Sequence, residues 1–262
     1  MTLLTPPADY HWTDEPWGPM LRCHALDGIT QHGFTSRQLE LRPGELASAR
    51  WAAAAASIGC GVSHVRRIRQ VHGAVVHVVR AGDPDAAPPD ADAAVTADAG
   101  VAVAVVAADC VPILLADAAT GAVAAIHAGW RGTAARVTEA TVAALRREFG
   151  AEPSRLVAAI GPSIGACCYE VGEDLLSAFA EHGHSSFDRA EWFVRDAQGR
   201  LRLDLWRANA DLLVRAGVPR AQVHVSGLCT KTHLAVFESF RAEGERAGRM
   251  AALIVAPPGA RR

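Results

Sequence analysis

The sequence contains no long apolar run and no long run of one charge. No window reaches the roughly 18 uncharged apolar residues that a membrane-spanning helix needs. The N-terminal stretch MTLLTPPADYHWTDEPW also lacks the basic and apolar segments of a secretion signal. The formal net charge is −2, and no Lys- or Arg-rich run is present to neutralise nucleic-acid phosphates. We therefore expect a cytoplasmic protein that binds neither membranes nor nucleic acid, and whose ligand is a small neutral or anionic molecule.

Two phosphate-binding motifs are missing as well. The glycines on either side of Cys60 do not complete a dinucleotide-binding fingerprint, and the sequence has no P-loop of the nucleoside-triphosphatase type. Six cysteines in a chain without a secretion signal indicate free thiols or metal ligands rather than a disulfide framework. With 262 residues, half of them apolar, the chain can bury a large core, and we expect residues 1–262 to form one domain.

What is present is an alternation of strand-like and helix-like segments. The apolar runs 100–110, 111–117 and 121–129 follow one another too closely for helices to intervene, so their sheet must be mixed. Residues 81–93 have the composition of a loop, and the first 50 residues appear irregular apart from one strand. Further strands are expected at 29–34, 75–79, 156–162, 223–227 and 251–257, a hairpin around 198–199, and helices at 51–58, 133–149, 173–181 and 205–217. The fold class is therefore α/β with mixed sheets.

Three residues at the ends of apolar runs are candidate metal ligands. They are His72 in RQVHG, Cys110 in AADCVP and His127 in AAIHAGWRG. One thiolate and two imidazoles form a borderline-soft donor set that suits zinc, and three protein ligands leave a fourth position open. Asp109 strengthens this interpretation, because a charge at the end of an apolar run is costly unless it is paired or functional.

The same atoms allow a second interpretation. An imidazole that removes the thiol proton turns a Cys–His pair into a nucleophile. A thiolate bound to metal is a poor nucleophile, so the two interpretations exclude each other at any one moment. The sequence alone does not separate them.

Several short blocks resemble the laccase-domain family. In chain order they are QVHG (70–73), ADAAVT (91–96), AADCVPILLAD (107–117), HAGWRGT (127–133), AAIGPSIGACCYEVG (158–172), LCT (228–230), SFR (239–241) and GR (248–249). This family is also called YfiH-, YlmD- or polyphenol-oxidase-like, and it includes the peptidoglycan editing factors. The resemblance runs from about residue 32 to residue 254.

The resemblance implies a layered α/β/β/α fold similar to that of cytotoxic necrotizing factor catalytic domains. It also implies one zinc ion on His72, Cys110 and His127, with copper as the alternative. The implied activity is phosphorolysis of adenosine, inosine, guanosine and methylthioadenosine, together with adenosine deamination. Purine nucleosides and phosphate are then the partners. The sequence leaves open whether the chain is a monomer or a homodimer.

The candidate site residues combine both lines of argument. The candidate catalytic residues are Cys110, Asp109 and His127, with Asp109 expected to position or protonate the leaving base or to orient a metal-binding histidine. Arg131 is expected to hold phosphate with its planar donor fork. The full set of candidates for substrate contact is Gln70, Arg131, Trp130, Ser163, Cys229, Thr230, Arg241 and Arg50.

Some features limit the resemblance. Residues 36–50 depart from the family pattern, which weakens the case for Arg50. Adjacent cysteines rarely bind one metal ion together, so Cys167 and Cys168 are assigned to the wall of the pocket. A true multicopper oxidase needs several His-x-His pairs, and only His182 and His184 form one. The alternatives are a copper-dependent polyphenol oxidase, a Cys–His hydrolase and a peptidoglycan editing factor.

Overall fold

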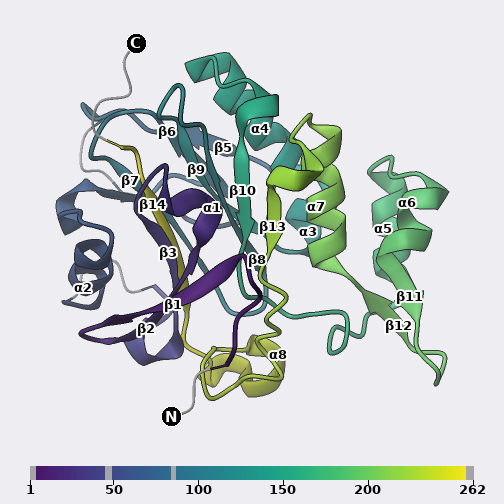
Figure 1. The fold of residues 1–262 in the computed structure, drawn as a ribbon. Coiled ribbons are helices and arrows are strands. Elements are labelled where there is room, and N and C mark those ends of the chain that lie inside the picture. Colours follow the sequence, from purple (N-terminus) through teal and green to yellow (C-terminus); the bar gives the residue numbers. More distant parts are fainter. Residues whose placement is uncertain (1–3, 45–48, 84–86, 258–262) are drawn as a thin grey trace.

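The computed structural model describes residues 4–44, 49–83 and 87–257. Residues 84–86 of the expected loop 81–93, and residues 45–48 of the divergent segment 36–50, lie outside these ranges. Within the described residues, two six-stranded sheets lie between helices (Figure 1). No described helix is long and apolar enough to cross a bilayer.

The first sheet contains both ends of the described chain. Its strands, in spatial order, are β1 (Tyr10–Glu15), β2 (Gly18–Cys23), β3 (His32–Thr35), β14 (Met250–Val255), β7 (Ala102–Ala107) and β4 (Val65–Arg67). Only the β4–β7 pair is parallel, so the sheet is mixed as predicted. Helix α2 (Ala49–Ser57) packs on its outer face, and α1 (His24–Asp27) follows β2.

The second sheet carries four of the motif blocks in its strands, those at 91–96, 107–117, 127–133 and 158–172. Its order is β13 (Val223–Val225), β10 (Val157–Ile160), β8 (Val111–Ala116), β9 (Val123–Ala128), β6 (Ala93–Thr96) and β5 (Val76–Val78). The helices that follow these strands are α3 (Trp130–Ala134), α4 (Val137–Phe149), α5 (Glu173–Glu181), α6 (Ser186–Trp192), α7 (Leu205–Arg215) and α8 (Phe240–Glu243), and the hairpin β11 (Phe193–Arg195) and β12 (Leu201–Leu203) lies between α6 and α7.

The layers follow from burial on both faces of each central strand. In β8, Ile113 and Leu115 pack toward α4 and α7, whereas Leu114 packs against the first sheet. In β14, Ile254 faces the second sheet and Leu253 faces α2. Strands buried on both faces appear as continuous apolar runs, which explains why the central strands were predictable. The order is helix, sheet, sheet, helix, and the predicted α/β class is confirmed.

Two expectations about local structure were wrong. The first 50 residues are not irregular, because β1 and β2 form a hairpin that pairs from Tyr10 opposite Cys23 to Glu15 opposite Gly18. Its outer strand is only half-buried and carries polar residues, so no apolar pattern marks it. The helix expected over 133–149 begins earlier and is broken, since Arg136 adopts a left-handed conformation (φ 64°) between α3 and α4.

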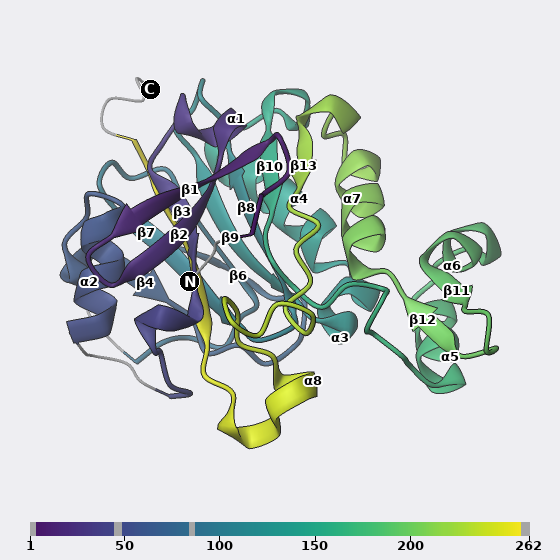
Figure 2. The same cartoon turned by 60° about the horizontal axis from the view of Figure 1, so that its bottom comes forward.

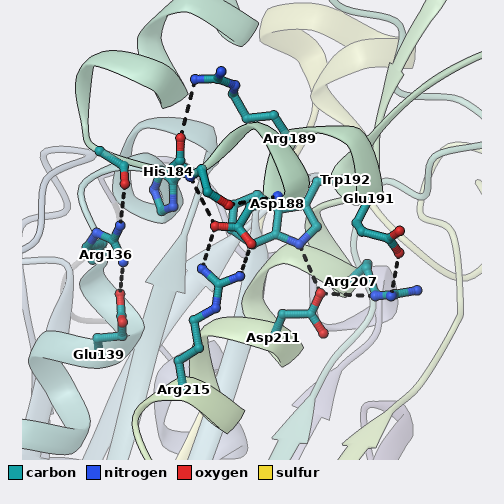
Figure 3. Close-up of polar contacts among 12 residues, drawn as sticks. Arg136, Glu139, His184, Asp188, Arg189, Glu191, Trp192, Arg207, Asp211 and Arg215 are labelled. Atoms are coloured by element: carbon teal, nitrogen blue, oxygen red, sulfur yellow. Dashed lines mark hydrogen bonds and ion pairs between the residues drawn. The ribbon is translucent and has the colours of Figure 1, made fainter.

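Helices α5 and α6 project beside α7 (Figures 1 and 2), and α6 contacts α7 through an ion pair between the buried Asp188 and the more exposed Arg215 (Figure 3). Asp188 accepts two hydrogen bonds from Arg215 of α7, and it also forms a capping box with Ser185 at the start of α6. Trp192 donates to Asp211 of α7 at 3.0 Å. These contacts fix the position of α6 against the rest of the chain.

Replacing Asp188 with alanine is expected to destabilise the protein by about 1–2 kcal/mol, because α6 loses its capping box and the ion pair with Arg215 is lost. Burial would raise the pKa of Asp188, but hydrogen bonds from Arg215 and Ser185 lower it below its ordinary 3.8. A lowered carboxyl pKa stabilises the fold above that ordinary value, and the contribution is lost as the pH falls through the folded-state pKa. Urea unfolding should therefore show a deficit at neutral pH that shrinks in acid. Glu181→Ala, on the exposed side of α5, is the control, and an equal deficit in both variants would contradict the prediction.

Candidate metal centre

The three predicted ligands come from three separate segments. His72 lies in the turn after β4, Cys110 lies between β7 and β8, and His127 lies in β9. Strands β8 and β9 are antiparallel neighbours, with Pro112 opposite His127. The start of β8 therefore lies beside the end of β9, which brings Cys110 and His127 close together. One donor atom from each residue lies within 4.8 Å of the others. The two imidazole rings meet edge to face, 4.9 Å apart.

A glycine makes room for this group. At Gly129, just before α3, a Cβ atom would lie 2.9 Å from the Cys110 sulfur and 3.3 Å from the His72 ring. A side chain at this position would therefore displace the ligands. The close approach of the Cys110 and His72 side chains explains why Gly129, the first glycine of HAGWRG, carries no side chain.

Asp92 holds two of the three ligands, and it was missed in the sequence. The side chain is fully buried just before β6. Its Oδ1 accepts a hydrogen bond from the His72 backbone N–H at 2.9 Å and lies 2.9 Å from Nδ1 of His127, while Oδ2 accepts from Gly73 at 2.6 Å. His72 has a positive φ of 62°, and its contact with Asp92 helps to maintain this uncommon conformation.

The hydrogen bonds of Asp92 also determine its charge and that of His127. Burial would raise the pKa of Asp92, but hydrogen bonds from His127 and Gly73 lower it instead. The carboxylate thus remains charged and fixes which nitrogen of His127 faces Cys110. The only sequence signal was the aspartate within the otherwise apolar ADAAVT block.

Cys110 and His127 shift each other's pKa values in opposite directions. Burial alone would raise the pKa of Cys110, but the charge of His127 and hydrogen bonds from His127 and His72 lower it to about 6. Burial would lower the pKa of His127, yet Cys110 and Asp92 raise it to about 9. The thiolate needed for metal binding is therefore present at neutral pH, and binding releases the proton of His127. The donor set, the spacing and the buried Asp92 all fit a metal ion.

Asp109 lies beside the ligands in a strained conformation. Its φ is 91°, outside the regions that side-chain-bearing residues ordinarily adopt. Its carboxylate accepts one hydrogen bond from the Thr230 hydroxyl and one from the Arg241 backbone N–H, both at 2.6 Å. These contacts tie the Cys110 turn to two segments that follow more than 100 residues later in the chain.

A cavity of about 970 Å³ opens at the three candidate metal ligands. This volume lies within the range of small-molecule sites. The lining combines His72, Cys110, His127 and Asp109 with Gln70, the aromatic residues Trp51, Tyr169 and Phe240, and the arginines Arg42, Arg67, Arg69, Arg241 and Arg249. A site with many cationic groups and aromatic walls suits an anionic ligand that carries a flat ring.

Two lining residues were among the predicted substrate contacts. Gln70 uses its side-chain amide to bind the backbone N–H and carbonyl of Val106, at 2.8 and 2.7 Å, so it also secures the end of β7. The Arg241 guanidinium donates to the Glu170 carbonyl at 2.9 Å and stacks on Tyr169. Thr230 reaches the site indirectly, through Asp109.

The other candidates lie outside the described lining of the cavity. Arg131 is exposed, and its guanidinium stacks on Trp130 at 4.3 Å. Ser163 and Cys229 are buried and form a bridge between their backbones. Arg50 forms an ion pair with Glu40 at 3.4 Å. Any substrate role for these residues stays a prediction.

Two further cavity residues were missed in the sequence. Arg249 is half-buried, and burial lowers its pKa, whereas the nearby charges of Cys110, Glu238 and Asp109 raise it. Tyr169 is mostly buried and follows Cys168. Both lie in motif blocks, GR and CCYEVG, but nothing in their spacing connects them with the metal ligands.

A family profile described as "Multi-copper polyphenol oxidoreductase laccase" matches residues 33–257. The chain belongs to this laccase-like family. The crystal structure of the hypothetical protein YfiH from Bacillus licheniformis superposes with a TM-score of 0.83 at 26% identity, covering 95% of this chain and 99% of that one. The family predicted from the motif blocks is confirmed.

Curated relatives in this family carry enzyme names. A "Purine nucleoside phosphorylase" of Deinococcus radiodurans is 42% identical over 203 residues, 78% of this chain and 74% of that protein. A protein of the same name from Bacteroides thetaiotaomicron is 41% identical over 160 residues, 61% of this chain and 58% of that protein. "Adenosine deaminase RL5", from an unknown prokaryotic organism, is 39% identical over 203 residues, 74% of this chain and 76% of that protein.

Proposed function

We propose that this protein is a zinc-dependent purine nucleoside phosphorylase that also deaminates adenosine. The observation that carries the proposal is that His72, Cys110 and His127 meet in the wall of a cavity lined by arginines and aromatic rings. The names of the relatives support the same reaction class. Inosine, guanosine and methylthioadenosine are the further substrates we expect.

The residues present fit zinc. One thiolate and two imidazoles are common zinc donors, and three protein ligands leave a position for water or substrate. Zinc bound there supplies a Lewis acid for the reaction. Asp92 accepts a hydrogen bond from Nδ1 of His127, so the other ring nitrogen would be free to bind the metal, and the lowered pKa of Cys110 favours its thiolate at neutral pH.

Arginines of the cavity are better placed than Arg131 to hold phosphate. In phosphorolysis a phosphate oxygen bonds to C1′ of the ribose while the bond from C1′ to the purine nitrogen breaks, and the departing purine takes up a proton. We assign phosphate to Arg249 and Arg241, since both line the cavity beside Asp109 and Cys110. Guanidinium groups suit this role because they donate two parallel hydrogen bonds to phosphate.

The purine is assigned to the aromatic part of the lining. Tyr169 and Phe240 border the same cavity, and Phe240 has a largely exposed ring. Asp109 is held by Thr230 and Arg241, so its carboxylate is fixed in position for a hydrogen bond with the nucleoside. We assign Asp109 to positioning the nucleoside. Its second role is to protonate the purine as it leaves.

Two other functions remain candidates. The family description names copper, and the donor set of the metal centre also accommodates that ion. Among the described residues, however, His182 and His184 join no group of metal-binding side chains, and His184 is buried against Phe179 and Trp192. The thiolate and imidazolium of Cys110 and His127 also describe the nucleophilic pair of a Cys–His hydrolase.

Inosine and adenosine turnover with and without phosphate tests the proposal, and an Arg249→Ala variant sharpens it. Ribose 1-phosphate should form only when phosphate is supplied, and the variant should raise the KM for phosphate about tenfold, which corresponds to one lost charge-assisted hydrogen bond. Adenosine deamination consumes water rather than phosphate, so it should change little.

The control for this experiment is Arg246→Ala, a nearby exposed arginine outside the described cavity lining. An equal loss of both reactions in Arg249→Ala would contradict the phosphate assignment. If metal-loaded protein consumes neither nucleoside, the proposed function is wrong.

A further inference from the structure

Three cysteines outside the metal centre come together on one side of the molecule. Cys167 and Cys168 lie in a tight turn after Gly165, where the N–H of Cys168 donates to the Gly165 carbonyl. Cys229 comes from a segment that pairs with Ser163. All three are free thiols, and their sulfur atoms lie within 4.8 Å of one another.

The spacing of these sulfurs suits a shared metal ion. The sulfur atoms of Cys167 and Cys168 are 3.7 Å apart. Three sulfurs bound to one ion at roughly 2.3 Å each lie about 4 Å apart in a planar arrangement. Sulfurs joined in a disulfide are only about 2.05 Å apart. Adjacent cysteines rarely share a metal ion, but here the turn points both sulfurs toward Cys229.

The surroundings act differently on the three thiols. Burial raises the pKa of Cys168 and raises that of Cys167 to about 12. Burial would also raise the pKa of Cys229, but hydrogen bonds, the first from the Gly165 backbone N–H, lower it. Cys229 is buried, and its sulfur accepts a hydrogen bond from the Gly165 backbone N–H at 3.3 Å.

Cys167 and Cys168 line a second cavity, of about 600 Å³, together with Arg202, Lys231 and Arg241. The lining also contains Arg200 and the carboxylate of Glu170, which pairs with Arg200 and Arg202. Cations still outnumber the one carboxylate of this lining, so they favour the thiolates that form when a metal ion displaces the thiol protons.

We propose that Cys167, Cys168 and Cys229 form a second metal site that binds one Cu(I) ion. Among the described residues, this group contains no histidine and no carboxylate. Three soft thiolates without a harder donor match Cu(I), whereas zinc in proteins ordinarily takes four ligands. This site is separate from the nucleoside site, although Arg241 lines both cavities.

Copper titration of the full chain tests the proposal. We would strip the protein of metal under reducing conditions and titrate Cu(I) against a competing chelator, using the Cys110→Ala background to remove the thiolate of the first site. X-ray absorption should show a copper shell made of sulfur alone, with one ion per chain. Cys167→Ser in the same background should weaken Cu(I) binding at least tenfold, because one of the three ligands is lost.

The variant and its control are chosen to keep the fold intact. Cys167 is exposed, so its serine variant should unfold at the same temperature as the parent. Cys60→Ser, a partly exposed cysteine elsewhere in the chain, should leave Cu(I) binding unchanged. Because the measurement is copper binding, it does not depend on whether nucleosides are substrates.

Three results would overturn the proposal. One is a copper shell that contains nitrogen or oxygen in the Cys110→Ala background. Another is unchanged Cu(I) affinity in Cys167→Ser. The third is zinc that displaces Cu(I) from the three cysteines at equal concentration, which would assign the site to a different ion.

Discussion

Cys110→Ala is expected to remove the bound metal and the nucleoside activity together. The variant deletes the only thiolate of the His72–Cys110–His127 group and leaves two imidazoles, one of them exposed. A bound metal ion contributes several kcal/mol to a reaction of this kind, so turnover should fall by about 10³-fold or more. Elemental analysis of the purified protein and the rate of ribose 1-phosphate formation measure the two losses.

The matched control for this experiment is Cys60→Ala, which removes a thiol that takes no part in the group. It should keep both metal and activity, and both variants should remain folded, because Cys110 is only partly buried and borders a cavity. Turnover that survives without metal would disprove the zinc dependence. Full metal content with no turnover would instead favour the nucleophilic interpretation of Cys110 and His127.

Asp92→Asn should weaken metal binding by about 10- to 100-fold, the usual cost of losing a carboxylate behind a metal-binding histidine. An asparagine side chain that donates to Nδ1 of His127 places the imidazole proton on the other nitrogen, which then has no lone pair for the metal. In the opposite orientation the asparagine NH₂ group replaces Oδ2, so two donors, this group and the Gly73 N–H, face each other. Either orientation disturbs the group.

Metal affinity is the direct measurement for Asp92→Asn. A second measurement is whether excess zinc restores turnover. Excess zinc should restore much of the turnover, because the three ligands themselves are still present. Asp14→Asn, at an exposed position of β1, should behave like the wild type. Normal metal affinity combined with lost activity would mean that Asp92 acts on the substrate and not through the ligands.

The parts of the fold that were predictable are those buried on both faces. The runs 100–110, 111–117 and 121–129 became β7, β8 and β9, since continuous burial leaves a continuous apolar pattern. The helix expected over 205–217 became α7, and Asp204 directly before it caps the helix by accepting a hydrogen bond from the Arg207 backbone N–H at 2.9 Å. Local chemistry is sufficient for such features because both partners lie close together in the chain.

The β1–β2 hairpin and the break at Arg136 were not predictable in this way. Strand β1 lies at the edge of its sheet and is stabilised by pairing with β2 more than by burial. The left-handed Arg136 separates α3 from α4 within a pattern that is helical on both sides. In each case the tertiary environment outweighs the weak local preference.

The sequence by itself determined the family, the α/β class and the three candidate metal ligands, because motif blocks and apolar periodicity are written in consecutive residues. Only the tertiary structure placed Asp92 behind His127, joined Arg241 to Asp109, and located Arg249 in the cavity while Arg131 lies outside its described lining. These partners are separated by 35 residues in the first pair and 132 in the second. Contacts between residues so far apart in the sequence depend on how the two sheets stack, and no local pattern encodes that arrangement.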